Sequence, residues 1–130
     1  MKLRFVCLLT ALAFPARLVL ADTWELQNST TGADLSAVTI LSANDIVVVG
    51  DKSGVAFVIR YTTNGGTIWN TPSTPGAPMG NNLNAIDLTG TTLVAVGKAG
   101  TITRSTDGGA NWTFPASPTT KQLQVVTFIS

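Results

Sequence analysis

The sequence predicts an all-β protein built from repeated small antiparallel sheets, and two observations lead to this expectation. Residues 83–112 are nearly a copy of residues 35–69, and the opening of the repeat recurs at residues 123–128. The three tryptophans stand at positions 24, 69 and 112, so that they lie 45 and 43 residues apart. A repeat of this length is typical of four short strands, which make one blade of a β-propeller.

Residues 1–21 have the pattern of a cleaved signal peptide. A basic start over residues 2–4 is followed by an apolar run over residues 5–14 and by small side chains in residues 19–21. A membrane anchor is the alternative, but a proline and an arginine break the run well short of the roughly twenty residues that span a bilayer. We therefore expect an exported protein (periplasmic, lumenal or extracellular) whose folded domain, an incomplete propeller, covers residues 22–130.

The composition of the expected domain excludes several function classes. Cys7, the single cysteine, lies in the expected signal peptide, so the domain has no disulfide of its own. After residue 21 there are seven acidic and five basic residues without a basic cluster, which argues against a nucleic-acid partner. The chain has no histidine. Catalytic triads that use histidine or cysteine and the usual zinc sites are thereby excluded, and we expect no cofactor and no metal.

The first blade is expected at residues 35–71. Apolar residues alternate over 35–40, as in a strand, and Ser42 to Asp45 form a turn. A continuous apolar run over 46–50 is typical of a strand covered on both faces. A third strand is expected over 56–61, and Trp69 is expected to open a fourth.

The second blade, at about 83–114, repeats this order. Its strands are expected over 83–88, 93–97 and 101–105, and at Trp112. Residues 123–130 are expected to be the first strand of a third blade, and residues 24–27 a leading outer strand. Proline-rich links, 70–82 and 114–120, separate the units, because proline cannot donate to a strand ladder.

A hairpin motif occurs in both blades. Its acidic residue has a structural role in the turn, so no catalytic role is needed to explain it. Asp or Asn caps its own turn, two glycines accept positive φ, and the tryptophan packs on neighbouring strands. The full pattern is Ser105, Asp107, Gly108, Gly109 and Trp112, and the softened copy is Thr62, Asn64, Gly65, Gly66 and Trp69.

This motif matches the Asp-box, or BNR repeat. The longer stretch, residues 97–112, resembles the repeat of the photosystem II assembly and stability factor family, whose members are exported seven-bladed propellers. In that family, blade arginines form a basic patch that docks a membrane-protein precursor. Arg104 fills the arginine position, whereas Tyr61 stands there in the first copy and Arg60 lies one place earlier. The resemblance thus implies the fold more strongly than the partner.

Sialidases also carry Asp-boxes, so an enzyme is a further alternative. Their chemistry needs three arginines and a tyrosine nucleophile, whereas residues 22–130 hold only Arg60, Arg104 and Tyr61. Asp45 and Asp51 read as turn residues rather than as a glycosidase pair. We therefore expect no enzyme, and a fragment of a sialidase-type glycoside hydrolase is the weakest alternative.

Two binding functions remain open at this point. The first is an assembly or scaffold module for a protein partner such as a membrane-protein precursor, and the second is a lectin-like, carbohydrate-binding propeller. Candidate binding residues are Arg104, Arg60 and Asp87. Asp87 stands alone among the acids in having no turn to explain it, since it replaces Thr39 and Thr127 in the strand expected to line a central channel. A channel-wetted carboxylate and a ligand or ion contact both fit that position.

The length of the chain raises the question of closure. Four blades of about 40–50 residues require roughly 160 residues or more, so residues 22–130 supply about two and a half. We expect either part of a longer propeller or a unit that assembles head to tail into a ring. The first is favoured, because a self-assembling unit is expected to end at a blade boundary.

Overall fold

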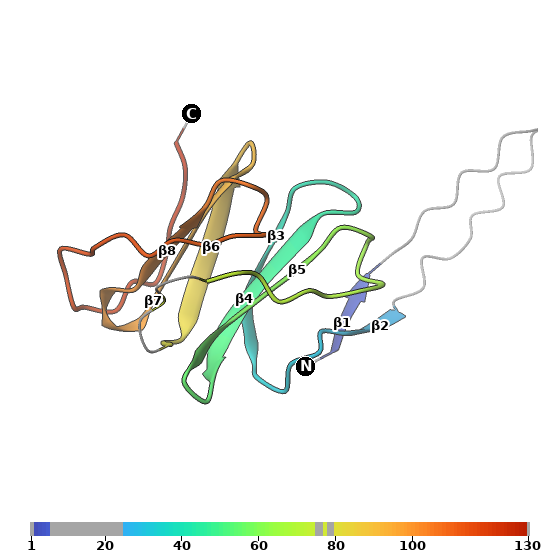
Figure 1. Cartoon of the computed structure of the whole chain (residues 1–130), viewed down its shortest axis with the longest axis horizontal. Helices are drawn as coiled ribbons and strands as arrows, with labels where there is room; N and C mark the ends of the chain where they lie inside the picture. Colours follow the sequence, from blue (N-terminus) through green and yellow to red (C-terminus); the bar gives the residue numbers. More distant parts are fainter. Residues whose placement is uncertain (1, 6–24, 75–76, 78–79, 130) are drawn as a thin grey trace, which may run out of the picture.

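The computed structural model describes residues 2–5, 25–74, 77 and 80–129. In these ranges the fold is all-β, with two three-stranded antiparallel sheets, a preceding pair of strands and no α-helix. Figure 1 shows these groups one after another along the long axis, with the chain passing from the N-terminal pair to the first sheet and then to the second. The predicted all-β class is confirmed, and the described residues form no closed sheet.

The first sheet consists of β3 (Leu35–Ile40), β4 (Ile46–Ser53) and β5 (Ala56–Thr62), in that spatial order. The turn between β3 and β4 is closed by Ser42, whose Oγ donates to Asp45 Oδ2 at 2.6 Å and accepts the Asp45 backbone N–H at 3.0 Å. Consequently the predicted turn residues do form the turn, and β4 lies between its two partners.

The second sheet repeats this arrangement with β6 (Leu83–Thr89), β7 (Thr92–Gly97) and β8 (Ile102–Ser105). A 3-10 turn, η1 (Lys98–Gly100), replaces the longer β-hairpin of the first sheet. Each first strand has a register shift near its start, between Leu35 and Ala37 and again between Leu83 and Ala85. A glycine is required at position 97, the end of β7, because the Asn82 carbonyl oxygen lies where a Cβ would stand.

The prediction of a fourth strand at Trp69 and at Trp112 is wrong. Instead, a single antiparallel bridge extends each sheet, between Tyr61 and Asn70 and between Arg104 and Thr113. A proline lies two positions beyond each bridge, at 72 and 115. Because proline has no N–H, the ladder stops after one pair.

The N-terminal pair is β1 (Lys2–Phe5) and β2 (Glu25–Asn28), which run antiparallel. The bounds of β2 are shifted by one residue from those of the predicted leading strand, 24–27. Trp24 lies outside the described residues, as do residues 1 and 6–21 of the expected signal peptide.

Residues 123–128 are not a strand, contrary to prediction. The segment nevertheless runs along the second sheet, where the Leu123 N–H donates to the Gly97 carbonyl at 2.9 Å. The Asn84 side chain donates to the Leu123 carbonyl at 2.7 Å, and the Phe128 N–H donates to Asp87 Oδ2 at 2.7 Å. No described strand forms a ladder with the segment, and side chains supply most of these contacts.

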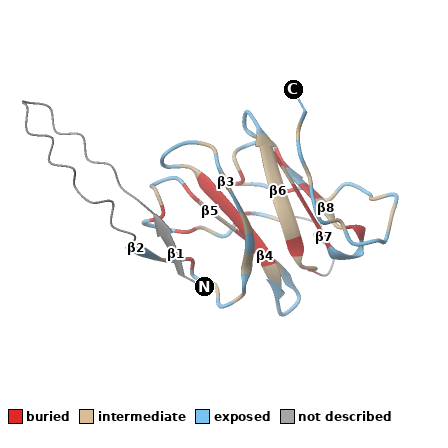
Figure 2. Ribbon diagram, turned by 180° about the vertical axis from the view of Figure 1, so that it is seen from behind, coloured by how far each residue is buried: buried red, intermediate tan, exposed pale blue. Residues whose placement is uncertain are grey.

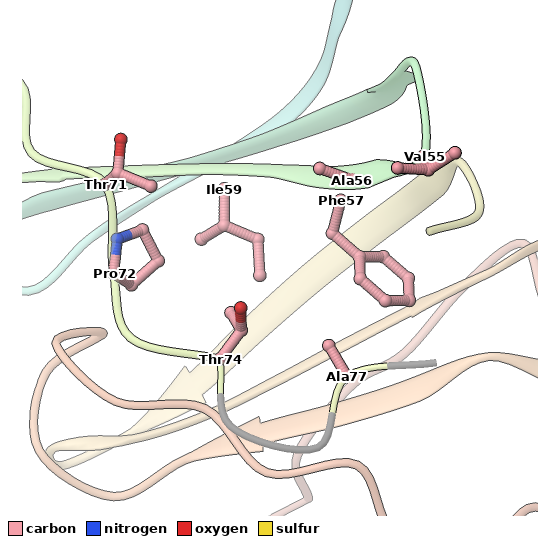
Figure 3. A pocket seen from close by; sticks show the side chains of 8 residues that line it. All are labelled: Val55, Ala56, Phe57, Ile59, Thr71, Pro72, Thr74 and Ala77. Carbon is pink, nitrogen blue, oxygen red and sulfur yellow. The ribbon is translucent and has the colours of Figure 1, made fainter. Parts of the chain in front are cut away.

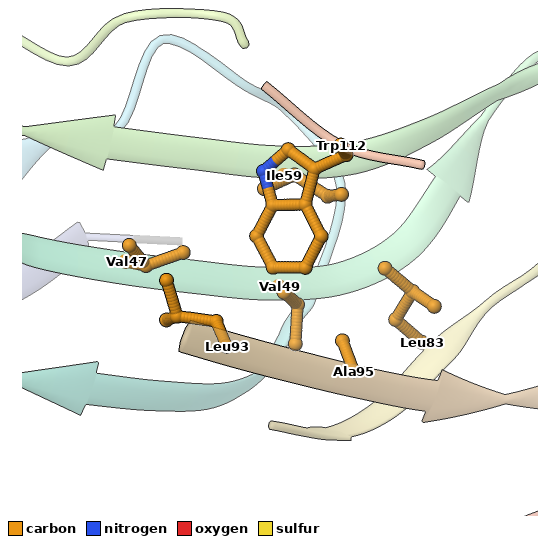
Figure 4. Packing of buried hydrophobic residues seen from close by; sticks show 7 residues of the cluster. All are labelled: Val47, Val49, Ile59, Leu83, Leu93, Ala95 and Trp112. Atoms are coloured by element: carbon orange, nitrogen blue, oxygen red, sulfur yellow. The ribbon is translucent and has the colours of Figure 1, made fainter. Parts of the chain in front are cut away.

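The central core lies between the two sheets. Trp112 is completely buried and packs with residues of both sheets (Figure 4), while Figure 2 shows that burial concentrates in β4, β5, β7 and the start of β6. The other members of this cluster are Val47, Val49, Ile59, Leu83, Leu93 and Ala95. Alternate residues of each middle strand thus face opposite sides of the sheet.

We call the two sides of each sheet leading and trailing. The trailing side of the first sheet carries Val47 and Val49 and faces the leading side of the second sheet. On the leading side of the first sheet, Ile46, Val48 and Trp69 form a second cluster. Both tryptophans therefore pack on the leading side of their own sheet, and Trp69 is 6% exposed.

Candidate functional site

The loop 105–112, which carries the full hairpin motif, is held together by its acidic residue. Asp107 Oδ1 accepts from Ser105 Oγ at 2.8 Å and from the Asn111 backbone N–H at 3.0 Å, and Oδ2 accepts from the Asn111 side chain at 2.7 Å. Partial desolvation acts to raise the pKa of Asp107, but the hydrogen bonds from Asn111 and Ser105 outweigh it and lower that pKa. The carboxylate is thus ionised and engaged within its own turn.

The loop 62–69 has the same geometry with an amide in place of the acid. Asn64 Oδ1 accepts from Thr62 Oγ1 and from the Ile68 N–H, each at 2.9 Å. The Gly66 N–H donates to Thr62 Oγ1 at 3.0 Å, as the Gly109 N–H does to Ser105 Oγ at 2.9 Å. An asparagine serves here because the turn needs an acceptor oxygen and not a charge.

The glycines of these loops are required by their position as well as by backbone conformation. Gly109 has a φ of +97°, and a Cβ there would lie 2.8 Å from Cγ2 of Val47 in the first sheet. Gly66 has a φ of +93°, and its Cβ would lie 2.9 Å from Oε1 of Gln27 in β2. Each loop therefore packs against the unit that precedes it.

The two tryptophans differ in their hydrogen bonding. Trp112 Nε1 donates to the Gly109 carbonyl at 2.9 Å. Trp69 Nε1 is buried, and no acceptor lies within hydrogen-bond distance of it. Neither indole face is exposed enough to stack on a ligand, since Trp112 is 0% and Trp69 6% exposed.

Asp87 has a backbone partner that the sequence did not reveal. Its Oδ2 accepts from the Phe128 N–H at 2.7 Å, and its Oδ1 accepts from the Leu88 N–H at 2.8 Å. The bonds from Phe128 and then Leu88 lower the pKa of this carboxyl despite an opposing desolvation contribution. Asp87 therefore anchors residues 123–129. The third copy of the repeat opening, residues 123–128, is the sequence feature that could have indicated a neighbouring segment.

The two candidate arginines are not brought together. Arg60 pairs with Val48, so it lies on the leading side of the first sheet, where its Nη1 donates to the Ile59 carbonyl at 2.8 Å. Burial lowers the pKa of Arg60. Arg104 pairs with Val94 on the trailing side of the second sheet and is exposed. The basic patch that the resemblance implied is therefore absent between these two residues.

Two cavities occupy equivalent positions in the two repeats, and sequence reasoning missed both. The first, of about 210 Å³, lies between the start of β5 and the link after Trp69 (Figure 3), and the second is about 420 Å³. The Phe57 and Phe114 rings, which line one cavity each, stack with centroids 5.0 Å apart. The first is lined by Val55, Ala56, Phe57, Ile59, Thr71, Pro72, Thr74 and Ala77, and the second by Asn81, Ala99, Gly100, Thr101, Ile102, Phe114, Pro115, Ala116 and Ser117.

The chemistry available in these cavities is limited to hydrogen bonding and apolar contact. Their lining residues include hydroxyl and amide groups but no ionisable side chain, so neither offers a group for proton transfer near neutral pH. Within the described ranges, no three acidic, histidine or cysteine residues gather as metal ligands do. In the same ranges, no helix has the length and apolar character needed to cross a bilayer.

Comparison with known proteins adds no relative. No protein-family model matches the chain, and neither a curated protein nor a solved structure matches it significantly.

Proposed function

We propose that the chain is an exported, non-catalytic binding module built from β-propeller blades. In this proposal the two sheets are neighbouring blades, residues 123–129 begin a third, and loops 62–69 and 105–112 are Asp-boxes. The observation that carries the non-catalytic assignment is the engagement of Asp107, whose two oxygens accept three hydrogen bonds inside its own turn. A carboxylate used in this way is a structural cap, not a general acid or base.

The ligand that we propose is a protein surface. Carbohydrate recognition relies heavily on exposed aromatic faces, and the described tryptophans are buried in the sheets. The repeat in residues 97–112 resembles that of the photosystem II assembly and stability factors, which favours a scaffold of that kind. However, Arg60 and Arg104 lie on opposite sides of the two-sheet stack, so we do not propose binding through an arginine patch.

A paired binding experiment tests this proposal. The tagged chain is used to capture partners from membrane extracts of its host, and the same preparation is applied to a glycan array. Capture of one defined protein that untagged chain competes away, together with a silent array, supports the protein-binding function. Glycan binding at micromolar concentration or better contradicts it in favour of the lectin-like alternative. Hydrolysis of a glycoside substrate that disappears in Asp107→Ala at unchanged melting temperature contradicts the non-catalytic assignment.

A further inference from the structure

Exposed apolar side chains gather at opposite ends of the two-sheet stack. On the leading side of the first sheet, Val38 is 46% and Ile40 57% exposed, and we call this pair the leading surface. In the segment beyond the second sheet, Val125 is 77% and Ile129 93% exposed, and we call this pair the trailing surface. Isolated exposed apolar residues are ordinary, but each of these pairs stands at repeat positions whose counterparts pack against the core inside the molecule.

The leading surface has a partly buried equivalent inside the molecule. Val38 and Ile40 of β3 occupy the repeat positions of Ile86 and Leu88 in β6. These two residues are only half-exposed, because they pack against the core between the sheets. The same positions are thus covered in the second sheet and uncovered in the first.

The trailing surface also has a partly buried equivalent. Val125 and Ile129 occupy the repeat positions of Ala37 and Leu41. Both of those residues pack against the same central core, from the first sheet's side. Inside the molecule, therefore, a trailing pair already meets a leading pair where β3 and β6 lie in contact.

The trailing surface is held in place before any partner arrives. The Leu123 N–H binds the Gly97 carbonyl, Asn84 binds the Leu123 carbonyl, and Asp87 accepts the Phe128 N–H. Ordering the segment in this way reduces the entropy lost on association.

From this repetition we infer that the leading surface of one copy docks on the trailing surface of a second copy of the chain. Each chain carries both complementary halves, and the contact between its own two sheets is the template for the contact between copies. The association is heterologous, so it proceeds head to tail and closes into a ring if the rotation allows. This inference rests on the packing of the two sheets and not on the ligand of the proposed binding module.

Sedimentation velocity on the full chain, over a concentration series, tests the inference. We expect the wild-type chain to associate reversibly, and Ile40→Asp or Ile129→Asp each to weaken association by about tenfold or more, because a charge replaces apolar contact area. Val55→Asp is the matched control, because Val55 is 70% exposed but lies outside both surfaces. It should associate as the wild type does, and circular dichroism and thermal melting should show all variants folded.

Mixing the two variants gives the sharpest result. Ile40→Asp retains its trailing surface and Ile129→Asp its leading surface, so the mixture should form a 1:1 dimer that grows no further. A wild-type chain that stays monomeric at several hundred micromolar overturns the inference. So does a mixture that stays monomeric while the wild type associates, or a Val55→Asp variant that dissociates as readily as the other two. These outcomes are independent of the capture experiment, which detects a foreign partner.

Discussion

Asp87 in β6 accepts a hydrogen bond of 2.7 Å from the backbone N–H of Phe128, a residue 41 positions further along the chain. The same carboxylate accepts the N–H of its neighbour Leu88 at 2.8 Å. Thr39 occupies the equivalent position of the first sheet, so this anchor belongs to the second sheet alone. One acidic side chain thereby fixes the end of the described chain on the sheet before it.

The anchor should be lost in acid. Because hydrogen bonding lowers the pKa of Asp87, its contribution to stability is present above the ordinary aspartate pKa of about 3.9 and disappears as the pH falls through the lower, folded value. The amide chemical shift of Phe128, followed by NMR, should titrate with a midpoint below about 3.9. Asp87→Ala should abolish this titration. A midpoint at or above the ordinary value would contradict the role of the carboxylate.

Asp107→Ala should destabilise the chain by roughly 1 kcal/mol, the scale of a lost capping interaction. Asn64→Asp should be neutral or mildly stabilising, because it restores the acid of the motif at a turn that already accepts the same bonds. Urea denaturation monitored by circular dichroism measures both. A loss of several kcal/mol in the first variant, or a clear loss in the second, would show that charge matters beyond the turn.

The two tryptophans should respond differently to the same substitution. Trp112→Phe removes the hydrogen bond to the Gly109 carbonyl, whereas Trp69→Phe removes an N–H that has no partner. Both lose packing, but Trp112→Phe should cost about 1 kcal/mol more. Unfolding free energies from chemical denaturation provide the comparison. Equal losses would mean that the Trp112 hydrogen bond contributes nothing net.

Gly109→Ala should destabilise the chain by about 1–3 kcal/mol, because the residue has a positive φ and its Cβ would meet Val47. Gly32→Ala is the control, since nothing lies within 4 Å of its Cβ position and its φ is not in the left-handed region. The control should be neutral or slightly stabilising. Thermal melting of both variants distinguishes local packing from a general intolerance of alanine.

The N-terminus of the exported protein should be Asp22 or a residue close to it, because the preceding residues have the basic start, apolar run and small-residue ending of a signal peptide. N-terminal sequencing of protein recovered outside the cytoplasm measures this directly. Recovery of intact Met1 in a membrane fraction would support an anchor instead.

Much of the fold was predictable because each strand has a local cause. The alternation in 35–40 and 83–88, and the continuous apolar runs in 46–50 and 93–97, correspond to β3, β6, β4 and β7 within a few residues. Periodicity records which residues of a strand are buried, and the repeat supplied a second reading of each element.

The errors share a different cause. A strand ladder needs a neighbouring segment with free backbone donors and acceptors. The sequence of one segment does not indicate whether such a neighbour exists. Pro72 and Pro115 end the pairing after Asn70 and Thr113, and residues 123–128 bind side chains where a strand was expected. The partner of Asp87 and the two cavities arise from contacts between distant segments, which no local pattern encodes.

The burial of Trp112 among residues of both sheets has a consequence for the order in which the chain folds. Val47, Val49 and Ile59 of the first sheet lack their cover until residue 112 is available, so the first sheet gains little by forming alone. During synthesis, the first sheet therefore lacks this part of its core until the second sheet and Trp112 have emerged. The two sheets should then fold in one cooperative step, and a nascent chain arrested before Trp112 should remain sensitive to protease.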